Sequence, residues 1–181
     1  MKRIKVLDKE FGLYIPQEKI ENAIQTVADR IDKDMAEKNP LFLVILNGAF
    51  MFASELFKRL DIECEISFVK LSSYSGTEST NVVRELIGLD HSLEGRNVVV
   101  VEDIVDTGHT MKYTIEKIKG LNAADVRIAT LFFKPESFQY DYKIDYKAMD
   151  IANEFIVGYG LDYNQHGRNF PDIYKIIEEN D

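Results

Sequence analysis

The chain has 181 residues, and its 22 basic and 31 acidic side chains give a formal net charge of −9. This length predicts one domain, residues 1–181, with a core of its own. The hydrophobic content of 45% is ordinary for a globular protein, and the 11 Phe and 9 Tyr residues, which need burial, exclude a freely disordered chain. The acidic balance disfavours a nucleic-acid binder, which needs clustered Lys and Arg, and no apolar run approaches the roughly 18 residues of a membrane span.

The N-terminal part predicts a helix, a buried strand and a second helix. Pro16 suits the first turn of a helix, and Asn39-Pro40 ends the apolar pattern that follows. Residues 41–46 are a continuous apolar run, typical of a strand buried on both faces of a parallel sheet. A turn at 47–49 precedes a predicted helix over 51–60. The helical pattern after Pro16 consists of Ile20, Ile24, Val27, Ile31 and Met35.

The next segment predicts a strand, a long loop and another strand. Residues 62–68 alternate between apolar and polar types, which is typical of a half-buried strand. Residues 72–81 are the most loop-like stretch, with Tyr74 as the only large apolar side chain. Residues 82–89 predict a further strand. The apolar face of the first strand would carry Ile62, Cys64, Ile66 and Phe68.

The second half continues the alternation of strands and helices. Residues 98–101 are four valines, which predict a fully buried strand. A helix marked by Met111, Ile115 and Ile118 ends near Gly120. Strands are predicted over 126–133 and 155–157. This order predicts an α/β fold with a mostly parallel central sheet and an antiparallel ribbon that carries the long loop.

The segment after the four valines carries the chemistry. Three carboxylates fall within five residues, and a Thr-Gly turn then leads into a helix. In open α/β sheets ligands bind beyond the carboxyl ends of strands, and the N–H groups at a helix N-terminus favour an anion. The sequence therefore predicts a phosphate site beside acids that bind sugar hydroxyls, hold a divalent cation or act as a base. The residues concerned are Glu102, Asp103, Asp106, Thr107, Gly108 and Thr110.

Other interpretations of this segment carry less weight. Asp106 or Thr107 could simply cap the helix, with acids near its positive end. The Asp-Thr-Gly triplet of aspartic proteases supplies two carboxylates that share a proton, but this chain has one copy, in a strand–turn–helix context. No Walker A sequence occurs, and Gly158-Tyr159-Gly160 lacks the third glycine of a dinucleotide fingerprint.

Residues 98–110 resemble the phosphoribosyl-pyrophosphate (PRPP) motif of type I phosphoribosyltransferases, an apolar strand, two acids and an acid-Thr-Gly-x-Thr loop. Three other stretches are similar in the same order: residues 46–49 to the short pyrophosphate loop, Ser73-Tyr74 to the pair in the long mobile loop, and residues 155–164 to the purine-binding segment. The resemblance covers about 41–171 and is nearest to family members that use 6-oxopurines. It implies the type I fold, with helices flanking the sheet and a small hood from N-terminal residues and about 135–181.

The resemblance also implies a reaction. The 5-phosphoribosyl group of PRPP passes to hypoxanthine or guanine, giving IMP or GMP and pyrophosphate in purine salvage, with Mg²⁺ as cofactor. Asp106 would be the general base near purine N7. Ribose and phosphate would be bound by Glu102, Asp103, Asp106, Thr107, Gly108, His109 and Thr110. Pyrophosphate would be bound by Leu46, Asn47, Gly48 and Arg168. The purine would be bound by Lys134, Phe155, Ile156 and Asp162. The metal would be held by Glu102, Asp103 and Asp162.

Several of these residues would not attract attention without the resemblance. By residue type and position alone, Lys134 fits a solvated lysine at a strand end, Phe155 a core aromatic and Arg168 a surface arginine. Two positions depart from the family pattern, because Asn47 and His109 stand where some relatives carry basic residues.

The remaining expectations concern partners and location. The single cysteine, Cys64, excludes an internal disulfide, and no apolar signal segment follows the basic N-terminus, so we expect a reduced, cytoplasmic protein. The resemblance implies a homodimer or homotetramer. A second hypothesis is a PRPP-sensing regulator of the same fold, which would need a basic surface for nucleic acid. A third is a phosphoribosyltransferase for xanthine, orotate or adenine. The match around Lys134 and residues 155–162 counters the last two bases.

Overall fold

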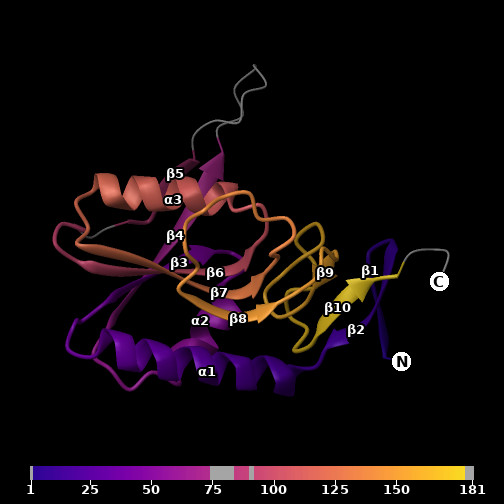
Figure 1. The fold of residues 1–181 in the computed structure, drawn as a ribbon. Helices are drawn as coiled ribbons and strands as arrows, with labels where there is room; N and C mark the ends of the chain where they lie inside the picture. Colours follow the sequence, from indigo (N-terminus) through magenta and orange to yellow (C-terminus); the bar gives the residue numbers. More distant parts are fainter. Residues whose placement is uncertain (1, 74–83, 90–91, 178–181) are drawn as a thin grey trace.

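A computed structural model describes residues 2–73, 84–89 and 92–177 (Figure 1). A six-stranded sheet forms its centre, and the strands are parallel except for β5, which runs antiparallel to β4. This arrangement confirms the predicted α/β fold and its antiparallel ribbon. In spatial order the strands are β5 (Arg84–Ile87), β4 (Glu65–Ser73), β3 (Leu41–Leu46), β6 (Asn97–Val105), β7 (Asp125–Phe133) and β8 (Tyr146–Asp150).

Helices cover both faces of this sheet (Figure 1). Helices α1 (Gln17–Met35) and α2 (Phe50–Phe57) pack on one face, and α3 (His109–Gly120) packs on the other. Alternate residues of β3 therefore enter different cores, with Phe42 beneath α1 and α2 and Leu43 beneath α3. The continuous apolar run of β3 is explained by this double burial.

Residues from both ends of the chain form a second, four-stranded sheet. Its strands, all antiparallel to their neighbours, are β1 (Arg3–Val6), β2 (Lys9–Ile15), β10 (Ile173–Ile176) and β9 (Ile156–Val157). Phe11, Val157 and Tyr174 form the centre of its own small core. Strand β8 belongs to the large sheet, although it lies within the 135–181 range that we expected in the hood.

The structure corrects three details of the prediction. Helix α2 ends at Phe57 rather than Leu60. Strand β4 begins at Glu65, and its apolar pattern is inverted: Ile66 and Phe68 are 38% and 46% exposed, whereas Ser67 between them is buried. Strands β1, β2, β8 and β10 were not predicted. Most of the expected long loop, including Tyr74, lies outside the described residues.

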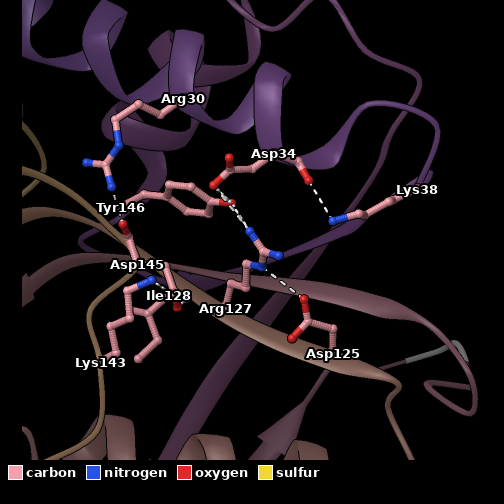
Figure 2. A network of polar contacts seen from close by, with 9 residues as sticks. All are labelled: Arg30, Asp34, Lys38, Asp125, Arg127, Ile128, Lys143, Asp145 and Tyr146. Atoms are coloured by element: carbon pink, nitrogen blue, oxygen red, sulfur yellow. Dashed lines mark hydrogen bonds and ion pairs between the residues drawn. The ribbon is translucent and has the colours of Figure 1, made fainter.

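A polar network attaches α1 to the edge of the large sheet (Figure 2). Tyr146 at the start of β8 is fully buried, and its hydroxyl donates to the Asp34 carboxylate (3.2 Å) while accepting from Arg127 (2.7 Å). Arg127 on β7 is also paired with Asp125 at 2.9 Å. Because the buried Tyr146 hydroxyl both donates and accepts a hydrogen bond, its burial costs little free energy.

None of the helices in the described part of the chain is long and apolar enough to cross a membrane.

Candidate functional site

The turn between β6 and α3 forms the first wall of the site. Asp106, Thr107 and Gly108 separate the end of β6 from the first residue of α3. Gly108 has φ +84°, a left-handed conformation that glycine adopts without strain, and a Cβ there would lie 2.4 Å from the Phe138 ring. A hollow, here called the loop pocket, is lined by Glu102 and residues 104–111. The α3 N-terminus therefore opens onto a concave site suited to an anion.

A second hollow adjoins the first and is here called the aromatic pocket. It shares Ile104 and Asp106 with the loop pocket. Its other lining residues are Asp103, Lys134, Glu154, Phe155, Ile156, Leu161 and Asp162. All four residues expected to bind a purine thus line one hollow, and that hollow meets the expected phosphate site at Asp106.

Lys134 faces Asp106 across the junction of the two pockets. The Lys134 ammonium lies 3.0 Å from the Asp106 carboxylate and 3.3 Å from the Asn153 side-chain oxygen. Lys134 is only 7% exposed, so it is not the solvated strand-end lysine that its position in the sequence suggests. A buried ammonium needs such partners. The negative charge that balances it comes from Asp106, whose side chain is 46% exposed.

Phe155 is an exposed aromatic at the pocket wall. It is 46% exposed, whereas the next residue, Ile156 in β9, is buried. Its ring packs edge-on against Tyr163 at 5.9 Å and is tilted against the buried Phe11 at 6.2 Å. These two neighbours hold the ring while leaving part of it open for a planar ligand.

Asp103 lies tightly against the turn that follows β3. A Cβ on Gly48 would lie 1.5 Å from an Asp103 carboxylate oxygen, and a Cβ on Gly160 would lie 2.1 Å from the Gly48 carbonyl oxygen. Gly160 also has φ +100°. The Leu46–Asn47 peptide bond just before Gly48 is cis. Only glycine at 48 and 160 allows three segments of the chain to meet at this point.

The two neighbouring acids of β6 line different pockets, although their side chains are hydrogen-bonded to each other. The resemblance requires Glu102 and Asp103 to reach one sugar, although adjacent residues of a regular strand point to opposite faces. Strand β6 continues to Val105. Accordingly Glu102 lines the loop pocket and Asp103 lines the aromatic pocket.

The environment of Asp103 favours its protonated form. Its side chain is crowded by protein although part of its surface is open, and the resulting loss of hydration raises the pKa of its carboxyl group. Hydrogen bonds with Glu102 and the Ile104 N–H (2.8 Å), and the positive charge of Arg168, oppose this shift. A cation bound beside Asp103 would act in the same direction as Arg168.

Arg168 is anchored to the loop after β9. Its guanidinium lies 2.6 Å from the Asp162 carboxylate and donates to the Gly160 carbonyl oxygen at 2.8 Å. Arg168 therefore lies beside the aromatic pocket and is not an isolated surface arginine, since Asp162 is part of that pocket wall.

Other expected residues lie less centrally. Leu46, Asn47 and Gly48 are outside the linings of both pockets, and Gly48 approaches the site through Asp103. Ser73 ends β4, and Tyr74 is outside the described residues. Within the described chain no three His, Cys, Asp or Glu side chains form a ready metal cage.

The sequence reasoning missed Asn153, Glu154 and Tyr140. Asn153 accepts from Lys134, Glu154 lines the aromatic pocket, and the Tyr140 hydroxyl lies 2.7 Å from His109 Nδ1. Asn153 and Tyr140 are 19 and 31 residues from their partners, so no local pattern could identify them. Glu154 directly precedes Phe155, and that proximity was the only available signal.

Comparison with known proteins is consistent with this geometry. Residues 14–164 match the family model for the phosphoribosyl transferase domain. A hypoxanthine-guanine phosphoribosyltransferase of Streptococcus thermophilus is 43% identical over 176 residues, 96% of this chain and 98% of that protein. The solved structure of a hypoxanthine phosphoribosyltransferase from Staphylococcus aureus has a TM-score of 0.85 at 34% identity, covering 92% of this chain and 91% of the other. A hypoxanthine-guanine phosphoribosyltransferase from Bacillus anthracis has a TM-score of 0.84 at 30% identity, with coverage of 92% and 98%.

Proposed function

This chain belongs to the phosphoribosyl transferase domain family, and from that membership we propose that it is a hypoxanthine-guanine phosphoribosyltransferase. It transfers the 5-phosphoribosyl group of PRPP to hypoxanthine or guanine, giving IMP or GMP and pyrophosphate in purine salvage. The observation that carries the proposal is the junction of two pockets at Asp106, one at a helix N-terminus and one containing Lys134 and Phe155. A 5′-phosphate suits the first pocket and a 6-oxopurine suits the second.

Asp106 is assigned as the general base. A purine nitrogen attacks the anomeric carbon more readily as its proton is lost, and a positioned carboxylate can accept that proton. Asp106 lines both pockets, so it is placed between the base and the sugar. Lys134, beside it, stabilises the negative charge that develops on the purine oxygen.

The remaining residues bind and orient the substrates. Phe155 stacks on the purine, and the Ile156 carbonyl oxygen accepts from the purine edge. The 106–110 turn binds the 5′-phosphate through N–H groups and hydroxyls. Arg168 and the 46–48 turn bind pyrophosphate. Ser73 and Tyr74 belong to a loop that excludes water from the cationic sugar during the reaction.

Magnesium fits the donor set of this site. Mg²⁺ takes oxygen ligands, keeps several waters and is often held by one or two carboxylates together with substrate phosphates. Asp103 and Asp162 line the aromatic pocket and Glu102 lines the adjoining loop pocket, so the site offers carboxylate oxygens of this kind. Glu102, Asp103 and Asp162 would hold the metal. Bound Mg²⁺ neutralises charge on the pyrophosphate leaving group.

The same chain is proposed to act in the cytoplasm as a homo-oligomer. Ile66 and Phe68 point to the face of β4 that is shared with α1 and α2, since they are paired in register with Phe42 and Val44. Both are more than a third exposed. A second copy of the chain would cover them. Phe68→Glu should give a smaller species by size-exclusion chromatography with light scattering, and an unchanged mass would contradict this assignment.

A substrate panel tests the proposed activity. The purified chain is supplied with PRPP and Mg²⁺ and, in separate reactions, hypoxanthine, guanine, xanthine, adenine and orotate. We expect IMP and GMP from the first two, and no turnover when EDTA replaces Mg²⁺. The absence of nucleotide from both bases, or a product from adenine or orotate alone, would refute the proposal. A net charge of −9 disfavours the alternative of a nucleic-acid-binding regulator.

A further inference from the structure

Residues 138–142, between β7 and β8, pack against the turn that forms the loop pocket. We call this segment the aromatic strap. The Gln139 N–H donates to the Thr107 carbonyl oxygen at 3.1 Å, and the Tyr142 hydroxyl donates to the Gly108 carbonyl oxygen at 2.6 Å. The third contact joins Tyr140 to His109. Two residues of the turn, Thr107 and Gly108, and the first residue of α3, His109, are thus each held by one residue of the strap.

The strap itself is rigidly packed. The Tyr140 and Tyr142 rings are stacked at 5.8 Å with an interplanar angle of 23°, and Phe138 meets Tyr142 edge-on at 5.0 Å. The Lys112 ammonium lies 5.2 Å from the centre of the Tyr140 ring. Tyr142 and Lys112 thus contact the Tyr140 ring and support the position of its hydroxyl beside His109.

We propose that Tyr140 is a positioning residue that orients the His109 imidazole so that Nε2–H binds the 5′-phosphate of PRPP and of the nucleotide product. This inference rests on the function proposed above. His109 lines the loop pocket, and its exposed ring has Nδ1 2.7 Å from the Tyr140 oxygen. Nε2 is then the ring nitrogen left for a ligand.

The hydrogen bond is compatible with both ring forms that carry a proton on Nε2. When the Tyr140 hydroxyl donates to Nδ1, the single proton of a neutral imidazole must be on Nε2. When the ring is charged, Nδ1 donates to the Tyr140 oxygen and Nε2 still carries a proton. Only the neutral form with its proton on Nδ1 would present a lone pair to the phosphate, and that contact is repulsive. A phosphate in the loop pocket therefore favours the two forms in which Nε2–H donates.

This arrangement gives a role to a position that departs from the family pattern. A flexible lysine at 109 would reach a phosphate without help, whereas a histidine must have its ring turned and its proton placed correctly. Tyr140, 31 residues away in the strap, holds the ring through Nδ1 and so meets the first requirement, the orientation of the ring.

The test compares substrates with and without a phosphate. In Tyr140→Phe, which keeps the ring and removes only the hydroxyl, KM for PRPP and the calorimetric Kd for IMP should rise by about three- to tenfold, the effect of one hydrogen bond. KM for hypoxanthine, which has no phosphate, should stay within twofold. The control is Tyr14→Phe in β2, whose hydroxyl bonds to none of the residues described, and it should leave all three constants unchanged.

Coupling between the two residues supplies a second criterion. His109→Ala should weaken the binding of PRPP and IMP by a similar factor. Adding Tyr140→Phe to it should weaken their binding no further, because Tyr140 acts through the imidazole. Additive losses, unchanged PRPP and IMP constants in Tyr140→Phe, or an equal rise in the hypoxanthine KM would each overturn the inference. If the wild-type chain neither binds IMP nor uses PRPP, the proposed function itself fails.

Discussion

The Lys134 ammonium lies 3.0 Å from the Asp106 carboxylate, at the point where the loop pocket and the aromatic pocket meet. This ion pair places two opposite charges beside one ligand position. A 6-oxopurine has an oxygen and a nitrogen on neighbouring sides of its ring system. An ammonium beside the oxygen and a carboxylate beside the nitrogen would pull electron density and remove a proton at the same time.

Replacing Asp106 by Asn tests its role as the base. The amide keeps an oxygen that can accept from Lys134, but it cannot take up a proton. We expect kcat to fall by about 10²- to 10⁴-fold, the usual contribution of a positioned acid or base, with KM for PRPP changed less than fivefold. Steady-state kinetics with hypoxanthine measure both constants. Asp29→Asn, on exposed α1 surface, is the control. An active Asp106→Asn enzyme would remove Asp106 from this role.

Replacing Lys134 by Met tests recognition of the purine oxygen. Methionine retains much of the buried stem and removes the charge, while the half-exposed Asp106 can still be hydrated. We expect kcat/KM for hypoxanthine to fall about 10- to 100-fold, the cost of one hydrogen bond to a charged group.

Asn153→Ala should cause a smaller loss of about three- to tenfold, because it frees the ammonium without removing it. Lys147→Met, at an exposed lysine of β8, is the matched control for the charge change. Equal kinetics of Lys134→Met and Lys147→Met would contradict the assignment.

The close approach at Gly48 gives a prediction that concerns PRPP rather than the purine. In Gly48→Ala the new methyl group would lie 1.5 Å from an Asp103 oxygen, while the other oxygen is bonded to the Ile104 N–H. The carboxylate must therefore move, and a displacement of this size costs about 10²-fold in activity. We expect kcat/KM for PRPP to fall by that factor and the Mg²⁺ requirement to shift to higher concentration.

Gly120→Ala is the control for this substitution, because a Cβ at the end of α3 meets no atom within 4 Å. Its activity and melting temperature should match those of the wild type. If Gly48→Ala also behaves like the wild type, Asp103 does not need its observed position.

The sequence predicts the parts of the molecule whose pattern is local. Strand β3 and the valines of β6 are continuous apolar runs because they are buried on both faces, and such runs are readable without any partner. The spacing of apolar residues in α1 can likewise be read from a short stretch of sequence. In β4, however, alternation predicts that Ile66 and Phe68 are buried, whereas both are exposed and neither belongs to a core cluster of the described residues. Periodicity identifies an apolar face but does not say what covers it.

The residues of the site also differ in whether a local sequence pattern identifies them. Asp106 and Gly108 could be identified because the acid, the turn and the helix are consecutive in the chain. Lys134 could be assigned only through the family resemblance, since a lysine at a strand end is ordinarily solvated. Its burial depends on Asp106 and Asn153, which lie 28 and 19 residues away. Tyr140 has no sequence signal, because its significance is a contact with His109 made by a loop.

The network around Tyr146 predicts how stability depends on alkaline pH. Burial raises the pKa of this hydroxyl to about 12, compared with about 10 in an unfolded chain. Between these values the unfolded chain binds fewer protons than the folded one, so the free energy of unfolding falls as pH rises. Burial also raises the pKa of Tyr142 and Tyr159, which adds to the decline.

Tyr146→Phe should therefore have opposite effects in two pH ranges. At pH 7 it should lower the free energy of unfolding by about 1–3 kcal/mol, because Asp34 and Arg127 lose a buried partner. Between pH 10 and 12 its stability should decline less steeply than that of the wild type, because one of the groups that titrates only on unfolding is gone. Urea unfolding at pH 7, 9, 10 and 11 measures both effects, with Tyr14→Phe as the control. Parallel curves for Tyr146→Phe and the wild type above pH 10 would show that Tyr146 ionises equally in both states, and the network would then not protect its hydroxyl.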